Sequence, residues 1–395
     1  AEDGIRDSVA SRGLGDVYKR QHKKGYKVEI YEQVEALSEL GAGVQLSPNA
    51  TRVLNHLDLF EDLEPYIFEP NSFQFLNYSS GKIITERKLG EAIKNDFNSP
   101  NYDIHRADLQ KVLLDKIEAE NIDIHTNMKV TSVGNNKNSA FIEVDEKKID
   151  ADLIIGADGI HSKVSDSLFG KKEIIFTGNV AWRMLIPVDL LPKNLILPNT
   201  TVWLGPNKHF VTYHVNGGKN LNCVCLVEQD GWLNESWSEK GDIEELKRIY
   251  KGWNKTIGTL LEHVDPNTLY RWALHDRPPM EQWSKGRILV LGDAAHPMLP
   301  FLAQGAAMAI EDGAVLANCI DNFDDIDEAL NQFEKIRKPR TSYVQSAARR
   351  NAKVLHLSGL AAILRNLVMG YVGNKIFNKL YSYDALSIVN KNHNN

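Results

Sequence analysis

The sequence is poor in cysteine, and this scarcity excludes one class of fold. Its 395 residues contain three cysteines, Cys223, Cys225 and Cys319, and no C-x-x-C pair. Three thiols cannot build the disulfide framework of a small secreted domain. We therefore expect reduced cysteines in a cytoplasmic protein, and no metal site.

Long apolar runs and a strong charge of one sign are also missing. No stretch of about 18 apolar residues occurs, so the sequence predicts no membrane-spanning helix. The formal net charge is −6, an ordinary balance that argues against nucleic acid as the main partner. What is present is a 43% hydrophobic chain, long enough for two or three domains, or for one nucleotide-binding domain with an insertion.

The order of the expected elements favours an α/β domain with a β-rich insertion. Alternating strand and helix signals occupy both ends of the chain, and a strand-rich pattern with aromatic residues occupies the middle. This order predicts a nucleotide-binding domain that is discontinuous in sequence, with the substrate site on the insertion. Strands are expected within 22–33, 122–156, 179–229 and 287–291, a hairpin at 73–89, and helices at 46–64, 105–121, 242–263 and over most of 304–382.

Two segments place polar or small residues at the end of a strand. Glu32 ends the first expected strand, where a carboxylate can accept hydrogen bonds from a ribose diol, although many strands end on a charged residue without such a role. In DLIIGADGIHSKV, residues 152–164, a buried-type strand enters a turn with Gly156 and Gly159. Asp158 can hold that turn or bind a ligand hydroxyl. A plain strand-to-helix turn would explain the segment equally well.

The segment 286–317 carries the clearest signal. A strand ends at Gly292 and Asp293, a loop follows, and a helix rich in small residues begins near Gly305. A helix N-terminus next to a strand end is a ready anion site, and small residues let the helix lie close to a ligand. Asp293 is placed to bind a chain of sugar-like hydroxyl groups.

Together these segments resemble the FAD-dependent aromatic hydroxylases, the family of salicylate hydroxylase-like and hydroxybenzoate hydroxylase-like enzymes. The resemblance runs from about residue 23 to about residue 385 and rests on the order and spacing of the motifs. The motifs are Glu32, GAGVQLSPNA at 41–50, HRADL at 105–109, GADG at 156–159, GDAAHP and QGAAMAIED within 292–312, and LYSYD at 380–384.

The resemblance implies FAD as the cofactor and assigns residues to it. Glu32 would bind the adenosine ribose, Arg106 would reach the flavin side, and Asp293 would bind the ribityl chain. The end of the small-residue helix would stabilise the negative charge of reduced flavin. The remaining cofactor-binding positions are Asp158 and Gly159, near the pyrophosphate and the nicotinamide nucleotide path, and Gly292, Pro300, Gly305 and Ala306, around the flavin.

The implied reaction consumes NADH or NADPH and O2. Reduced FAD would form a flavin hydroperoxide, which transfers one oxygen atom to a small aromatic or heteroaromatic acid. Because such rings react faster as phenolates, a base near the substrate hydroxyl would help. His209 and Tyr213 are the candidate catalytic residues, since positions i and i+4 of a strand share a face and the resembling subgroup has a similar His-x-x-x-Tyr pair in its pocket. Core or surface packing is the alternative role.

Several nearby residues keep two interpretations. His296 is either a structural loop residue or a catalytic one. Trp182 and Arg183 either line the insertion, with Arg183 facing a carboxylate, or serve core packing and a surface ion pair. Some relatives carry a polar residue where Pro300 stands, which leaves the substrate class open.

The first 21 residues depart from the family. Spacing counted back from Glu32 puts the three glycines of G-x-G-x-x-G at positions that hold Val9, Ser11 and Leu14. The segment also lacks the apolar residues of a central parallel strand and the regions of a signal peptide. We therefore expect residues 1–21 to be foreign to an otherwise genuine enzyme. If the segment belongs to the protein, FAD binding should be badly weakened.

The sequence thus predicts a discontinuous Rossmann-like FAD-binding domain, an inserted β-sheet substrate domain and C-terminal helices. The apolar stretch 355–380 is expected to pack against the body or against a second subunit of a homodimer. Two rival functions stay open: an epoxidase or quinone-precursor hydroxylase on the same fold, and a non-catalytic truncated flavoprotein. The expected divisions are 1–21 (atypical), 22–175 (FAD-binding, first part, its 73–89 hairpin on the substrate side), 176–277 (substrate domain), 278–345 (FAD-binding, second part) and 346–395 (C-terminal helices).

Overall fold

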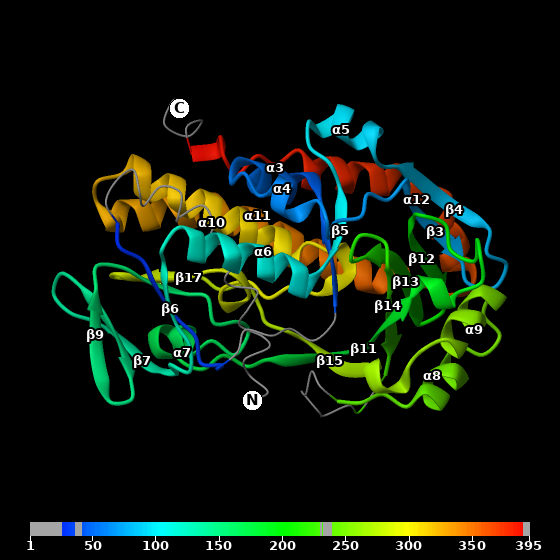
Figure 1. The fold of residues 1–395 in the computed structure, drawn as a ribbon, viewed down its shortest axis with the longest axis horizontal. Coiled ribbons are helices and arrows are strands. Elements are labelled where there is room, and N and C mark those ends of the chain that lie inside the picture. The colour runs from blue at the N-terminus through cyan, green and yellow to red at the C-terminus, as the bar shows by residue number, and fades with distance from the viewer. Residues whose placement is uncertain (1–25, 36–41, 230, 232–238, 390–395) are drawn as a thin grey trace.

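The computed structural model describes residues 26–35, 42–229, 231 and 239–389. Residues 1–21 lie outside the described residues, so the expectation that they are foreign stays a prediction. The described chain combines several sheets with long helices (Figure 1).

Short strands build the part of the fold that the sequence assigns to the nucleotide. They are β1 (Glu29–Tyr31), β6 (Asp123–His125), β10 (Ile154–Gly156), β16 (Ser284–Lys285), β17 (Ile288–Val290), and the pair β2 (Gly43–Leu46) and β5 (Tyr102–His105). β1 pairs in parallel with β6, and β10 pairs in parallel with β17. A separate antiparallel sheet at one end of the molecule contains β7 (Val130–Asn135), β8 (Ala140–Val144) and β9 (Lys147–Ala151).

A seven-stranded sheet forms the other half of the molecule. Its strands, in spatial order, are β15 (Tyr270–Asp276), β11 (Ile175–Pro187), β14 (Asn220–Glu228), β13 (Lys208–Val215), β12 (Thr200–Gly205), β3 (Ser72–Asn77) and β4 (Ile83–Lys88). All neighbours are antiparallel except β12 and β3. The β3–β4 pair confirms the expected hairpin at 73–89 and joins the strands of the insertion in one sheet.

Alternate side chains of this sheet serve two cores. On one face, Trp182 and Phe210 pack with α8 (Ile243–Ile249) and α9 (Lys255–Glu262). On the other face, Leu226 and Trp272 pack with Phe301 and with the end of a long helix. This second face therefore meets the part of the chain that follows Asp293.

Helices cover the short strands and run along the length of the molecule (Figure 1). They are α3 (Pro48–His56), α4 (Phe60–Leu63), α5 (Glu91–Phe97), α6 (Arg106–Ala119), α7 (Lys163–Phe169), α10 (Gly305–Asn322), α11 (Ile326–Leu355) and α12 (Gly359–Tyr381). The expectation of one helix over 46–64 was wrong, because Asp58 has a φ of 54° and separates α3 from α4. α11 continues through residues 345 and 346, where a domain boundary was expected.

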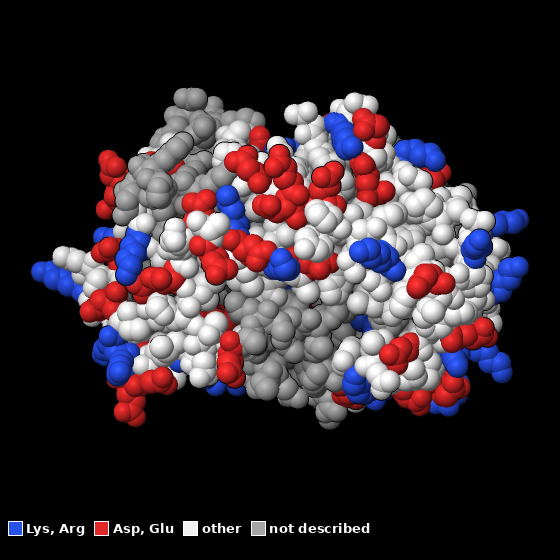
Figure 2. Space-filling model, in the orientation of Figure 1, with Lys and Arg blue, Asp and Glu red and all other residues white. Residues whose placement is uncertain are grey.

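α12 packs one side against β4 and exposes the other. The exposed apolar side chains follow helical spacing: Leu360, Ile363, Leu364, Leu367, Val368, Tyr371 and Val372. Within the described residues, no helix has both the length and the apolar character needed to cross a membrane. On the face shown in Figure 2, acidic and basic side chains are interspersed, and acidic ones gather toward the top.

Candidate active site

A pocket of about 1070 Å³ lies between the two parallel strand pairs. β1 and the residues around it form one wall, and β10 with the turn that follows it forms the other. In the described residues these strands belong to two separate sheets, so the pocket lies where one continuous parallel sheet would have its middle. Its volume lies just above the range of about 300–1,000 Å³ found for ligand sites.

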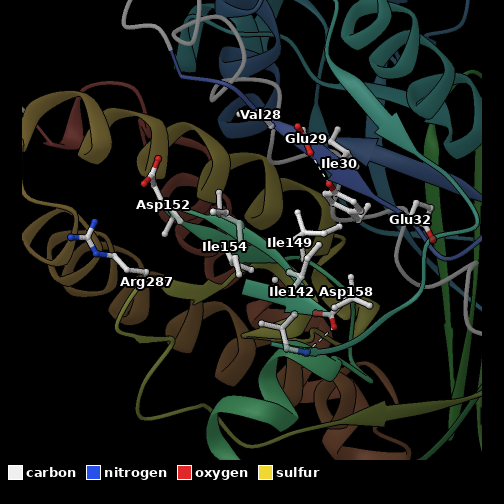
Figure 3. Close-up of a pocket in the computed structure, with 18 of the residues that line it drawn as sticks. Val28, Glu29, Ile30, Glu32, Ile142, Ile149, Asp152, Ile154, Asp158 and Arg287 are labelled. Carbon is white, nitrogen blue, oxygen red and sulfur yellow. Dashed lines mark hydrogen bonds between the residues drawn. The ribbon is translucent and has the colours of Figure 1, made fainter. Parts of the chain in front are cut away.

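The pocket has an apolar middle and charged side chains at both ends, with Asp152 and Arg287 at the end away from Glu32 (Figure 3). Ile30, Ile149 and Ile154 supply apolar side chains, and Glu32 and Asp158 lie toward the same end (Figure 3). That end is where β1 and β10 finish, which is where nucleotides bind in α/β folds.

The two carboxylates at this end have different surroundings. Burial raises the pKa of Glu32, although its Oε1 accepts a hydrogen bond from the backbone N–H of Val34 at 3.1 Å. Asp158 accepts from the Ser162 hydroxyl and, at 3.0 Å, from the backbone N–H of Val164. Asp158 therefore holds the turn that contains Gly159 (φ 76°), and both carboxylates line the pocket.

The third predicted segment has the expected geometry. β17 ends at Val290, Gly292 adopts a φ of 57°, and Asp293 follows in a half-buried position. α10 begins at Gly305 with no side-chain cap, and a Cβ built on Gly305 would meet nothing within 4 Å. Gly305 and Ala306 are both half-buried. The N-terminus of this 18-residue helix therefore faces open space, where its N–H groups can bind a carbonyl or anionic oxygen.

A buried ionic network packs against the loop between β17 and α10 and joins it to α10 and α11. The Asp312 carboxylate lies 2.6 Å from His296 Nε2 and accepts from the Gly292 backbone N–H at 3.0 Å. Arg337 donates to Glu311 at 2.6 Å and to Asp312 at 2.7 Å. Burial raises the pKa of Asp312, but the charges of His296 and Arg337 outweigh it and lower the pKa overall. These contacts favour the structural role for His296.

Arg106 connects two of the motifs. It is the first residue of α6, it is buried, and its backbone N–H donates to the Ala42 carbonyl at 2.8 Å. Residues 42–45 and the start of HRADL therefore lie side by side, where β2 pairs with β5.

The predicted catalytic pair occupies the sheet face that meets this loop. His209 and Tyr213 share that face of β13, and the His209 ring lies 5.6 Å from the Phe301 ring, directly after Pro300. Tyr213 packs so closely on Gly43 that a Cβ there would lie 2.4 Å from its ring. Burial and the neighbouring His356 hold the pKa of His209 well below its usual value, and burial raises that of Tyr213.

Trp182 and Arg183 point to opposite faces of β11. Trp182 is fully buried in the core with α8 and α9, which agrees with the packing interpretation. The Arg183 guanidinium lies 4.2 Å above the Trp272 ring, and its charge acts to lower the pKa of Tyr213. The structure thus brings Arg183 and Tyr213 to one face.

Sequence reasoning missed His356, which contacts His209, and Glu228, which contacts His356. His356 lies 2.8 Å from His209 although 147 positions separate them, and Glu228 binds His356 from the far side at 2.9 Å. Neither stands in a recognisable motif, and only the packing of α11 on the sheet brings them together.

Comparison with known proteins settles the family. The family model "FAD binding domain" matches residues 22–345. This chain belongs to the FAD-dependent aromatic hydroxylases. It is 32% identical over 337 residues to 3-amino-4-hydroxybenzoate 2-monooxygenase PtnB3 of Streptomyces platensis, covering 85% of this chain and 84% of that protein. It is 30% identical over 354 residues to 6-hydroxynicotinate 3-monooxygenase of Pseudomonas fluorescens, covering 88% and 91%.

The fold agrees with this membership. The solved structure of a salicylate hydroxylase substrate complex superposes with a TM-score of 0.80 at 21% identity, covering 98% of this chain and 95% of that one. The hydroxylase is therefore a flavin-dependent monooxygenase with FAD as its cofactor. The expected α/β fold and the expected cofactor are both confirmed.

Proposed function

We propose that this hydroxylase uses NADH or NADPH and O2 to hydroxylate a small aromatic or heteroaromatic acid that carries a ring hydroxyl. The observation that carries the proposal is the grouping of His209, Tyr213 and Arg183 on the sheet face that meets the Pro300 loop. The relatives named for aminohydroxybenzoate and hydroxynicotinate support a substrate of this class.

The described residues fit FAD along two stretches. Glu32 would bind the adenosine ribose at the end of the pocket where β1 and β10 finish, and Asp293 would bind the ribityl chain. Arg106 would approach the flavin side. The N–H groups at Gly305 and Ala306 would face the pyrimidine end of the ring, because the space before them is open. The positions proposed to line the rest of the cofactor path are Asp158, Gly159, Gly292 and Pro300.

FAD, once reduced by the nicotinamide nucleotide, would activate O2 and supply one oxygen atom to the ring. The protein's own residues would prepare the ring for that transfer. His209 would accept the hydroxyl proton, Tyr213 would hydrogen-bond the resulting oxyanion, and Arg183 would hold the carboxylate. A neutral His209 suits this role, because only the neutral imidazole can accept a proton.

Purified holoenzyme tests the proposal directly. We expect hydroxybenzoates and hydroxypyridine carboxylates to stimulate NAD(P)H oxidation, with a hydroxylated product identified by mass spectrometry. His209→Asn should lower kcat by about 10²–10⁴-fold, the usual contribution of a positioned base. His263→Asn is the matched control, because His263 binds only the Thr259 carbonyl among the described contacts, at the end of α9.

The two rival functions give different results in the same assay. Stimulation by neutral apolar substrates, with none by acids, would favour the epoxidase or quinone-precursor hydroxylase, and Arg183 in the site argues against this. Flavin binding without any stimulated oxidation would favour the non-catalytic alternative.

Location and assembly are also proposals. The three cysteines are free and buried, which supports the expected reducing cytoplasmic compartment. The exposed apolar side of α12 supports the expected homodimer.

A further inference from the structure

We propose that His356 and Glu228 extend His209 into a proton path that joins the substrate hydroxyl to solvent. This inference rests on the proposed function of His209 as the group that accepts the hydroxyl proton. It adds two positioning residues, both from outside the recognised motifs.

The path consists of two consecutive hydrogen bonds. His209 Nδ1 lies 2.8 Å from His356 Nε2, and His356 Nδ1 lies 2.9 Å from Glu228 Oε1. Both imidazoles are buried, whereas the Glu228 side chain is 44% exposed. The chain of contacts therefore begins inside the protein, beside Phe301, and ends in water.

Backbone hydrogen bonds fix the three residues relative to one another. Asn207, in the turn before β13, donates its N–H to the His356 carbonyl at 3.1 Å and accepts from the Glu228 N–H at 2.9 Å. The His209 carbonyl accepts from the Tyr250 hydroxyl at 2.9 Å. The end of α11, the start of β13 and the end of β14 are thus held together by main-chain contacts as well as by the two imidazoles.

Burial and the neighbouring charges keep the imidazoles of His209 and His356 neutral. Burial lowers the pKa of His356, Glu228 raises it, and the positive charges of Arg365 and Lys208 lower it again. The pKa of His209 is lowered too, by burial and by His356. Both rings are therefore neutral near neutral pH, and a neutral imidazole can donate from one nitrogen while it accepts at the other.

Each proton transfer is balanced along this path. The substrate O–H bond breaks and its proton binds His209 Nε2, while the Nδ1 proton of His209 passes to His356 Nε2. The Nδ1 proton of His356 then passes to Glu228 and on to water. Return of one proton along the same path would neutralise the product oxyanion before release and restore both imidazole tautomers.

Proton release on ligand binding tests the path in the holoenzyme. 3-Hydroxybenzoate is mixed with enzyme in weak buffer containing a pH-indicator dye, without NAD(P)H. Wild-type enzyme should release a proton, and His356→Gln and Glu228→Gln should slow this release by at least about tenfold. Added imidazole should restore the rate in Glu228→Gln. Glu244→Gln, at an exposed position of α8, is the control. Unchanged release in His356→Gln would overturn the proposal.

A second measurement separates this proposal from the proposed function. Nitrogen NMR of the histidine rings, recorded without substrate, should show scalar coupling across the His209–His356 hydrogen bond. It should also show a lower pKa for His356 in Glu228→Gln, because Glu228 raises it. Absence of that coupling refutes the path even if hydroxylation occurs. Coupling without any hydroxybenzoate binding supports the path geometry and counts against the proposed substrate class.

Discussion

Arg337→Met probes the buried ionic network behind the loop between β17 and α10. Arg337 is fully buried in α11, with Nη1 2.6 Å from Glu311, Nε 2.7 Å from Asp312 and Nη2 3.2 Å from the Met308 carbonyl. Methionine has a similar length and no charge. The substitution therefore leaves two buried carboxylates with one cation fewer between them.

The loss in the free energy of unfolding can be estimated from the contacts of Arg337. Removing one partner of a buried ion pair costs about 3–5 kcal/mol, because the remaining charge stays desolvated. Total stabilities are about 5–15 kcal/mol, so much of the folding free energy would be lost. Arg340 remains 2.9 Å from Glu311 and His296 remains by Asp312, which keeps the loss within that range.

The effect also depends on pH in a defined direction. The folded-state pKa values of Glu311 and Asp312 are lowered, because their cationic partners outweigh burial. Their contribution to stability is therefore present at neutral pH and is lost as the pH falls through those lowered values. Without Arg337, one of the charges that lower both pKa values is gone, so both pKa values rise relative to wild type and acid relieves the uncompensated charge. The stability difference between wild type and variant should narrow on acidification.

Urea unfolding followed by tryptophan fluorescence, at about pH 7 and about pH 5, measures both quantities. Arg350→Met is the matched control, because Arg350 is exposed on the same helix and should change stability by less than about 0.5 kcal/mol. Equal stability of the two variants, or a difference that does not change with pH, would refute the reasoning.

Three further predictions follow from the described contacts and the sequence. Gly43→Ala should displace Tyr213, lower the free energy of unfolding by about 1–3 kcal/mol and lower kcat. Gly258→Ala has open space around it and should change neither quantity. Urea denaturation and steady-state kinetics measure the two effects. Burial raises the pKa of Asp103 to about 7, so stability should fall by about 4 kcal/mol between acid and neutral pH, and Asp103→Asn should remove most of this slope in urea titrations. Replacing residues 1–21 by an apolar strand and a G-x-G-x-x-G loop in family register should raise FAD affinity at least about tenfold in equilibrium dialysis; unchanged affinity would contradict the expected role of that loop.

Much of the fold could be predicted from local patterns. The strand leading to Gly292 and the small-residue helix from Gly305 were both expected, because a short apolar run and helical periodicity are local signals. The division between α3 and α4 was not expected. It occurs at Asp58, which adopts a left-handed conformation, and no glycine or proline stands there to indicate the break.

The site was predictable only in part, for a physical reason. His209 and Tyr213 were predicted because strand periodicity puts positions i and i+4 on one face and because the resembling family has a similar His-x-x-x-Tyr pair, and the structure places both on one face of β13. Their partners come from elsewhere in the chain: His356 from the end of α11, and Gly43 from β2. Contacts between distant segments depend on how helices pack on the sheet, and single-sequence periodicity does not encode that packing. For the same reason, the ion pairs of Arg337 with Glu311 and Asp312 were not predicted from the sequence.

The alternation along β13 has a consequence for how such an enzyme can change its substrate. Phe210 packs with α8 and α9, whereas His209, Val211 and Tyr213 face the loop after Asp293. Mutations at the second set alter the proposed substrate site without touching the residues that anchor the sheet to its helices. A mutant library restricted to that set should therefore keep a high fraction of folded members. Natural divergence among these hydroxylases can explore new ring substitution patterns by the same route.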